Sequence, residues 1–380
     1  MNAKLSRLIS PVTVGRRLLL CVVGVSVLAG ATDAAQEPAR PSSQSTPAAS
    51  PPVLPAGLAP APAPQWIPAP GPATDKAYAP QAILPGGVVV TLFPSGSTYL
   101  KIDRVKEPEV YNMMRGVPGR IQSIVNIHNP SIEFHPVDSG INTGAVVILA
   151  AGGGHNTLNV GTEGADFVPF FYNYGVSTVI LRNRLRRDGY NPQTDEVYDA
   201  LQAIRMVRAR AQEWGIDSHK IGIVGFSAGA ELAAPAALIY EQFDRTNSQP
   251  GDPLAGISSR PDFVGLVYPG PTPLARDPST LIPPDAPPSF LVCAGSGDAQ
   301  HAIWADQYFA AFLKAQVPNL EMHIYGNGVH ANGLKDRNDT PFGTWQYRFI
   351  DWFRDLGFLQ KPGVETKAAK DLQAYSAQKR

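Results

Sequence analysis

The sequence predicts an α/β fold in which a largely parallel central sheet is covered by helices on both faces. From about residue 120 onward, strand-like segments alternate with segments of helical periodicity, which is typical of a parallel sheet. Two strand-like segments, 145–149 and 176–181, are continuous apolar runs, as expected of strands buried on both faces. Between residues 195 and 214, apolar side chains recur at helical spacing, and Gly215 marks the expected end of that helix.

The remaining elements follow from the same patterns along the chain. The predicted strands span residues 131–135, 145–149, 176–181, 221–224, 263–268, 289–294 and 320–325. The predicted helices span residues 195–214, 302–315 and 344–356. No internal repeat is visible, and this part of the chain is long enough to form one sizeable core.

Four segments are expected along the chain. Residues 1–31 have a basic leader, a short apolar run and a small-x-small ending, which predict a signal peptide, with an uncleaved anchor as the alternative. Residues 32–81 are rich in proline and alanine and predict a disordered linker, because such a composition cannot bury enough apolar surface to fold. Residues 82–362 are expected to form the catalytic domain and residues 363–380 a polar tail. The expected location is periplasmic or secreted.

Composition excludes several classes of function. The chain has 32 basic and 32 acidic side chains, so it offers no long-range positive field for a nucleic acid. Only two cysteines are present, Cys21 in the apolar leader and Cys293 in a predicted strand, so removal of the leader leaves no pair for a disulfide. Metalloprotease and phosphate-loop motifs are absent as well. We therefore expect no metal and no organic cofactor, and no stable membrane insertion after cleavage of the leader.

The most informative motif is Gly225-Phe226-Ser227-Ala228-Gly229. It follows a predicted buried strand and opens a segment rich in small residues, which is the context of a nucleophile elbow rather than of a chance match. Such a tight strand-to-helix turn places the serine in strained backbone, and the glycines on either side remove steric clashes. Ser227 is therefore the predicted nucleophile.

A serine hydroxyl is a weak nucleophile that needs a histidine base and an orienting carboxylate. His330 lies in a glycine-rich turn after the last predicted strand, where a base could reach Ser227, and His301 is the alternative candidate. Asp298 lies just past the strand at 289–294 and is the predicted acid. Asp306 falls inside the following helix and is expected to be a solvated charge.

An oxyanion hole is the third requirement, because negative charge develops on the carbonyl oxygen of the substrate. Three glycines, 152–154, follow the predicted strand at 145–149, and glycines let backbone N–H groups approach a substrate closely. The predicted donors are the N–H groups of Gly153 or Gly154 and that of Ala228, the residue after the nucleophile.

Taken together, these motifs resemble the α/β-hydrolase superfamily, specifically its bacterial esterase branch with acetyl xylan esterase-like and feruloyl esterase-like enzymes. The resemblance covers residues 121–359 and includes the pieces 152–155, 163–164, 198–208, 225–229, 260–263, 268–269, 297–298 and His330. It implies an α/β-hydrolase fold with a small cap or none. The chain departs from the usual pattern at His155, where the family often has an aromatic residue, and at Ala230-Glu231, which replaces Gly-His.

The sequence thus predicts an exported serine esterase that acts on small-molecule or polysaccharide esters. The resemblance favours acetyl or feruloyl esters on plant polysaccharide. A lipase, a peptidase or an acyltransferase would use the same residues, and a non-catalytic envelope binding protein on a hydrolase scaffold is the alternative from another class. A cluster of arginines could meet an acidic sugar, although such a run is more often solvated, with Arg184 paired to an internal carboxylate; its members are Arg182, Arg184, Arg186 and Arg187.

Overall fold

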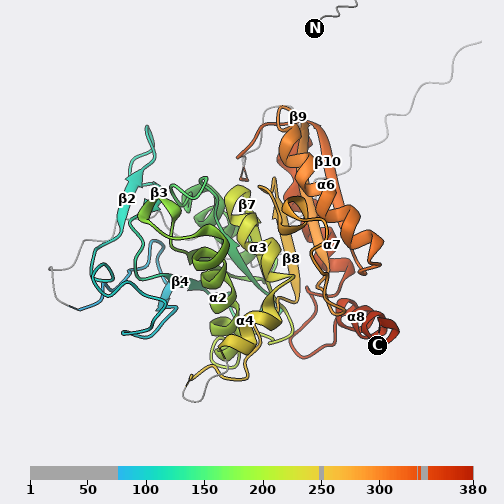
Figure 1. Ribbon diagram of the computed structural model, residues 1–380, viewed down its shortest axis with the longest axis horizontal. Helices are drawn as coiled ribbons and strands as arrows, with labels where there is room; N and C mark the ends of the chain where they lie inside the picture. The colour runs from blue at the N-terminus through green and yellow to red at the C-terminus, as the bar shows by residue number, and fades with distance from the viewer. Residues whose placement is uncertain (1–75, 248–251, 332, 335–340, 380) are drawn as a thin grey trace, which may run out of the picture. The chain divides into compact units, whose positions relative to one another are not determined.

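The computed structural model describes residues 76–247, 252–331, 333–334 and 341–379 of the 380-residue chain (Figure 1). The predicted signal peptide and most of the predicted linker lie outside the described residues. None of the helices within the described ranges is both long and apolar enough to cross a bilayer.

An eight-stranded sheet forms the centre of the described chain, and its spatial order is β1-β4-β6-β5-β7-β8-β9-β10. The strands from β6 to β10 pair in parallel, whereas β4 pairs antiparallel with both β6 and β1 at one edge. Their bounds are β1 (Val88–Thr91), β4 (Ser131–His135), β5 (Val146–Ala150), β6 (Ser177–Arg182), β7 (Ile221–Phe226), β8 (Phe263–Val267), β9 (Ser289–Ser296) and β10 (Glu321–Asn327). The predicted fold class, a mostly parallel sheet, is confirmed.

Helices cover both faces of this sheet, because the central strands are buried on both sides. In β5, Val147 and Leu149 pack into the cluster that contains helices α1 (Phe167–Tyr172) and α7 (Trp345–Asp355). The alternate residues of β5, Val146 and Ile148, face the larger cluster on the other side. That side carries α2 (Val197–Ala209), α3 (Ala230–Ala236), α4 (Tyr240–Thr246) and α6 (Ala299–Lys314), and Figure 1 shows α2 and α3 side by side on it. The connection between β8 and β9 contains only the four-residue helix α5 (Pro273–Arg276), in agreement with the expectation of little or no cap.

The antiparallel part of the fold differs from the sequence-based expectation. Strand β1 and the separate two-stranded sheet of β2 (Val110–Met113) and β3 (Ile121–Val125) were not predicted. Strands β1 and β2 have four residues each and are partly exposed along their length. Strand β1 does contain an apolar run of three valines, but both strands are shorter than the fully buried parallel strands β5 and β6. Helix α2 ends at Ala209 rather than at residue 214, and α6 begins at Ala299, before the predicted start at residue 302.

The domain begins earlier than the predicted boundary at residue 82. The N–H of Tyr78 donates to the Val105 carbonyl at 2.9 Å, and its own carbonyl accepts from the Asn129 side chain at 2.7 Å. The carbonyl of Gln81 accepts a hydrogen bond from the buried guanidinium of Arg182 at 2.7 Å. Their composition resembles that of the preceding segment and so predicts a disordered linker up to residue 81, but this prediction is wrong for residues 76–81.

The C-terminal residues also differ from the expected polar tail. Helix α8 (Lys367–Lys379) buries Ala368 and Tyr375, and the Tyr375 hydroxyl donates to the Ala315 carbonyl at 3.2 Å. Ala368, Leu372 and Tyr375 lie at helical spacing, but charged and polar side chains dominate the other positions of the segment, so its composition indicates a tail. The tail prediction is therefore wrong, since the segment is an ordered helix docked on the domain.

Removal of helix α8 is expected to lower the melting temperature. A chain ending at Glu365 would expose the surface under Ala368 and Tyr375, at a cost of about 2–3 kcal/mol for burial of this size. For a domain of about 300 residues, that corresponds to a decrease of roughly 3–5 °C in a thermal scan. An unchanged melting temperature would show that the helix does not contribute to stability.

Candidate active site

Ser227 lies on a sharp turn between β7 and α3. Its backbone has a φ of 52°, in the left-handed region that non-glycine residues rarely adopt. The turn is pressed against the end of β5, because a Cβ atom on Gly229 would lie 1.9 Å from the carbonyl oxygen of Ala150. Only glycine fits at residue 229, and this close approach holds the serine above the end of the sheet.

The structure brings Ser227, His330 and Asp298 together, although they come from three separate strand ends. Ser227 Oγ lies 2.8 Å from His330 Nε2, and His330 Nδ1 lies 3.0 Å from Asp298 Oδ2. An ionised carboxylate can only accept hydrogen bonds, so Nδ1 of His330 carries the proton and Nε2 is left to accept from the serine hydroxyl. This arrangement suits the removal of a proton from Ser227.

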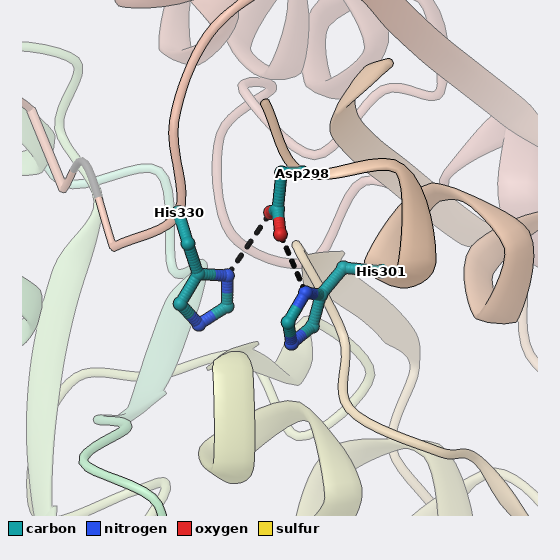
Figure 2. Close-up of side chains that lie close together, drawn as sticks. All are labelled: Asp298, His301 and His330. Atoms are coloured by element: carbon teal, nitrogen blue, oxygen red, sulfur yellow. Dashed lines mark hydrogen bonds and ion pairs between the residues drawn. The ribbon is translucent and has the colours of Figure 1, made fainter. Parts of the chain in front are cut away.

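A second imidazole contacts the same carboxylate (Figure 2). His301, in the first turn of α6, places its Nδ1 atom 2.5 Å from Asp298 Oδ1, and its ring stacks on His330 with centroids 3.9 Å apart. Burial lowers the pKa of His301, and the neighbouring His330 lowers it further. The sequence offered His301 as an alternative to His330, whereas the structure joins both to Asp298 and places only His330 within hydrogen-bond distance of Ser227.

The loop that carries His330 is fixed from below by Tyr268 and Trp345. The Tyr268 hydroxyl accepts from the Gly333 N–H at 3.0 Å, and the Trp345 indole N–H donates to the Gly333 carbonyl at 3.1 Å. The Tyr268 ring also packs edge-on against His330, with centroids 5.0 Å apart. Neither role could be predicted from the sequence, because contacts between different strand ends have no local signature.

The same tyrosine joins the loop that carries His330 to the glycine loop after β5. The Tyr268 hydroxyl donates to Glu163 Oε1 at 2.8 Å, and Glu163 Oε2 accepts the Gly152 N–H at 2.7 Å. Burial raises the pKa of Glu163, although the two hydrogen bonds that it accepts oppose the shift. Glu163 is almost completely buried, so it acts as a fixed support for the glycine loop.

The glycine loop offers free backbone donors near Ser227. Gly153 has a φ of 133°, and a Cβ atom there would lie 2.1 Å from the Thr157 carbonyl oxygen, so the loop conformation requires glycine. Within the described residues, neither Gly153 nor Gly154 donates its N–H to another protein group. Both N–H groups are therefore available for a substrate oxygen. The N–H of Ala228, in the turn that leads into α3, is the third candidate donor.

His155, directly after the glycine loop, lies between two carboxylates. Its Nδ1 atom is 2.8 Å from Glu196 Oε2, and its Nε2 atom is 3.3 Å from Glu231 Oε1, in the nucleophile helix α3. Both ring nitrogens face carboxylate oxygens, an arrangement that favours a proton on each nitrogen and therefore the cationic ring. Burial alone would lower the pKa of His155, but the hydrogen bonds to the two carboxylates outweigh it and raise the pKa to about 9. Glu231 also pairs with Arg276 of α5.

This buried cation makes the stability of the domain depend on alkaline pH. The pKa of His155 is about 9 in the folded protein and about 6.5 in an unfolded chain, so its stabilising effect is complete below pH 6.5 and is lost as pH rises through 9. We expect the free energy of unfolding to fall by as much as about 3 kcal/mol from this group between pH 6.5 and 10.

The measurement is denaturant unfolding at a series of pH values, with Glu231→Gln as the comparison. Loss of one carboxylate lowers the folded pKa of His155, so the variant should show a smaller decrease across this interval. Equal pH dependence in both proteins would contradict the assignment of a cationic His155.

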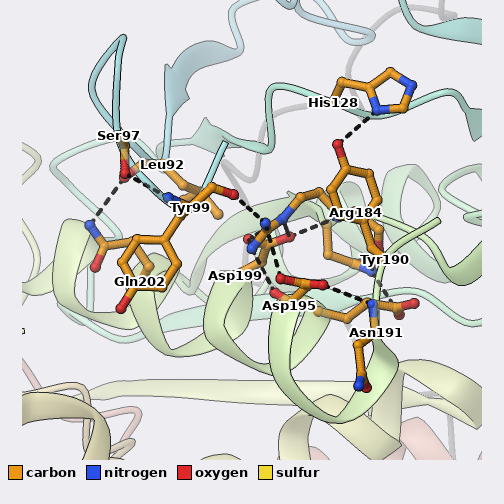
Figure 3. Close-up of polar contacts among 12 residues, drawn as sticks. Leu92, Ser97, Tyr99, His128, Arg184, Tyr190, Asn191, Asp195, Asp199 and Gln202 are labelled. Atoms are coloured by element: carbon orange, nitrogen blue, oxygen red, sulfur yellow. Dashed lines mark hydrogen bonds and ion pairs between the residues drawn. The ribbon is translucent and has the colours of Figure 1, made fainter. Parts of the chain in front are cut away.

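Two of the four clustered arginines are buried, and Figure 3 shows the contacts of one of them, Arg184. The Arg184 guanidinium is buried and donates to Asp199 Oδ1 at 2.8 Å and to the Tyr99 carbonyl at 2.6 Å. Arg182 is also buried and pairs with Glu109 and Glu133. The side chains of Arg186 and Arg187 reach the carbonyls of Gly154 and Asn156. For Arg182 and Arg184, the suggestion of an acidic-sugar contact is therefore wrong, because internal carboxylates neutralise both.

The fold and the site define the class of protein. The sheet is mostly parallel, and a serine lies on the turn after one of its central strands. The carboxylate and then the histidine follow later strands, which is the arrangement of the α/β-hydrolase fold. The chain has this fold.

Comparisons with known proteins agree with that class. Residues 135–254, less than half of the chain, match the family model described as BD-FAE. A segment of 124 residues is 30% identical to endo-1,4-beta-xylanase B of Butyrivibrio fibrisolvens and covers 32% of this chain and 19% of that protein. A segment of 127 residues is 30% identical to an acetylxylan esterase of Xylanibacter ruminicola and covers 33% of this chain and 23% of that protein. The chain thus spans about a fifth of the length of these curated relatives.

A solved structure extends the similarity over most of the domain. The acetyl ester-xyloside bifunctional hydrolase of Caldicellulosiruptor lactoaceticus superposes with a TM-score of 0.56 at 23% identity, covering 72% of this chain and 97% of that one. At this identity, the likeness concerns the fold.

Proposed function

We propose that the protein is a serine esterase that hydrolyses carboxylic esters through an acyl-enzyme. The observation that carries the proposal is the 2.8 Å contact between Ser227 Oγ and His330 Nε2 at a strained turn, beside a glycine loop with unused N–H groups. The similarity of a third of the chain to an acetylxylan esterase supports the same chemistry.

The proposed reaction uses each group in turn. Ser227 Oγ attacks the ester carbonyl while His330 Nε2 takes its proton, and Asp298 orients the imidazole and stabilises the imidazolium. The N–H groups of Gly153 or Gly154 and of Ala228 stabilise the oxyanion. His330 then protonates the leaving alcohol. In the second half, His330 activates a water molecule that attacks the acyl-enzyme and releases the acid and free Ser227.

For the substrate, we propose acetyl or feruloyl esters on plant polysaccharide. The family model that matches residues 135–254 and the relatives named for xylan chemistry support this class over simple lipids. We further propose export to the periplasm or the medium, supported by the basic and apolar leader over residues 1–31. A lipase, a peptidase or an acyltransferase would use the same groups and would be distinguished by its substrates.

A labelling experiment tests the proposed serine chemistry. A fluorophosphonate probe should label the wild-type protein stoichiometrically and should leave Ser227→Ala unlabelled. A non-catalytic binding protein on this scaffold would give no labelled wild-type band. Export is tested separately by cell fractionation of chains with and without residues 1–31.

Hydrolysis rates then separate the candidate substrates. We would compare acetyl, butyryl and feruloyl esters of p-nitrophenol with acetylated xylan, using release of acetate as the readout for the polymer. Preference for long acyl chains, or hydrolysis of peptides but not of acetylated xylan, would overturn the substrate proposal while leaving the serine mechanism in place.

A further inference from the structure

The Asp298 carboxylate binds one imidazole more than the proposed reaction requires. His330 Nδ1 lies 3.0 Å from Asp298 Oδ2, and His301 Nδ1 lies 2.5 Å from Asp298 Oδ1. The reaction uses only the first of these contacts. Figure 2 shows the two rings with both Nδ1 atoms directed at the same carboxylate from one side.

These three side chains form a set of ligands suited to a transition-metal ion. Within the described residues, they are a group in which one ligand atom of each lies within 4.8 Å of the others. A tetrahedral Zn²⁺ with bonds of about 2.0–2.1 Å needs ligand atoms about 3.3 Å apart. Modest side-chain movement would therefore bring the three ligand atoms to the spacing that zinc requires. Two imidazoles and one carboxylate are ligands that zinc favours, whereas calcium and magnesium prefer oxygen donors.

The cluster is accessible to an ion from solvent. The side chain of Asp298 is 6% exposed, whereas those of His301 and His330 are 23% and 32% exposed. Solvent can therefore reach the imidazoles and supply a water molecule as the remaining ligand.

We propose that Asp298, His301 and His330 bind a divalent transition-metal ion such as Zn²⁺, and that this ion inhibits the enzyme. The ion is an inhibitor here and has no part in the reaction. The inhibitory half of the proposal rests on the proposed function, whereas the binding half does not.

Inhibition follows from the position of one proton. When Zn²⁺ binds Nδ1 of a neutral His330, the proton of that ring moves from Nδ1 to Nε2 and none is lost. Nε2 then donates to Ser227 Oγ instead of accepting from it, so it can no longer take the serine proton. Asp298 is drawn to the ion as well and no longer orients the base. No redox step or further reactant is involved.

Zinc binding is measured first, without reference to activity. Isothermal titration of Ser227→Ala with zinc chloride, in a buffer that does not chelate metals, should give one bound ion per chain at micromolar concentration. His301→Ala in the same background should weaken binding at least about tenfold. His301→Asn keeps a hydrogen-bond donor for Asp298 but is a poor zinc ligand. It should weaken zinc binding as much as His301→Ala does if His301 binds the metal directly, and less if His301 only positions Asp298.

A matched control comes from another histidine–carboxylate pair. His323 Nε2 lies 2.7 Å from Glu321 Oε1 on β10, outside the site. His323→Ala should leave zinc affinity unchanged.

Inhibition is measured next on the active protein. Zinc at tens of micromolar should abolish hydrolysis of p-nitrophenyl acetate, EDTA should restore it, and magnesium at the same concentration should have no effect. The half-inhibitory zinc concentration should rise at least about tenfold in His301→Ala and His301→Asn, each compared with its own metal-free rate.

Three results would overturn the proposal. They are the absence of zinc binding to the Ser227→Ala protein up to about 1 mM, equal affinity in the His301 variants, and loss of binding in His323→Ala instead. If the wild-type protein hydrolyses no ester at all, the proposed function fails, and the calorimetric comparison still decides whether the site binds zinc.

Discussion

Ser227→Ala is expected to lower kcat by three orders of magnitude or more while leaving the fold intact. The hydroxyl lies at a turn with φ of 52° and is 2.8 Å from His330 Nε2, so its removal eliminates the nucleophile with little loss of packing. His330→Ala should cost about as much, and the double variant should be no worse than either single one, because the two groups act as a unit.

The measurement is the steady-state rate on p-nitrophenyl acetate, with melting temperatures to confirm folding. The control is Asp306→Asn, a helix residue outside the contacts described here, which should keep kcat within a factor of a few. Additive losses in the Ser227/His330 double variant would mean that the histidine serves something other than the serine.

Gly153→Ala has the second largest expected effect. The new Cβ atom would lie 2.1 Å from the Thr157 carbonyl oxygen at a φ of 133°, so the loop must move and withdraw its N–H from the oxyanion. Loss of one such donor lowers kcat by about 10²–10³-fold. The effect should fall on kcat more than on KM, because the negative charge on the oxygen is absent from the bound ester and develops only on the way to the tetrahedral intermediate.

Gly154→Ala is the matched comparison for this prediction. Its φ is 62°, but the nearest atom to an added Cβ is Asn156 Nδ2 at 3.7 Å, so strain is present without a steric clash. We expect a smaller loss of kcat than for Gly153→Ala. Retention of more than about a tenth of the wild-type kcat by Gly153→Ala would show that this loop does not hold the oxyanion.

The parts of the fold that the sequence predicted well are those with one dominant physical signal. Continuous apolar runs mark β5 and β6, because both faces of a parallel strand are covered. The short strand β1 has no fully buried residue and helix α8 buries only two, and the position of α8 depends on contacts such as that between Tyr375 and the Ala315 carbonyl. Such contacts join distant residues and leave no periodic pattern.

The candidate site divides in the same way. Ser227, Asp298 and His330 could be singled out because each follows a strand end in a fixed chain order. The contact between His301 and Asp298 could not be predicted from the sequence, because it depends on the direction in which His301 points from the first turn of α6. The partners of His155 were equally hidden, since Glu196 and Glu231 are 41 and 76 residues away and are two among 32 acidic side chains.

The anchoring of the His330 loop by Trp345 also determines when a newly made chain becomes competent. Synthesis delivers the glycine loop first, then the nucleophile, then the acid, and only afterwards the base and the tryptophan that holds its loop. Because folding during translation proceeds from the N-terminal side, a nascent chain presents Ser227 long before it has an anchored proton acceptor. Fragments truncated before α7 should therefore be inert, so the proposed ester hydrolysis would report only on chains that have been made and folded at least through α7.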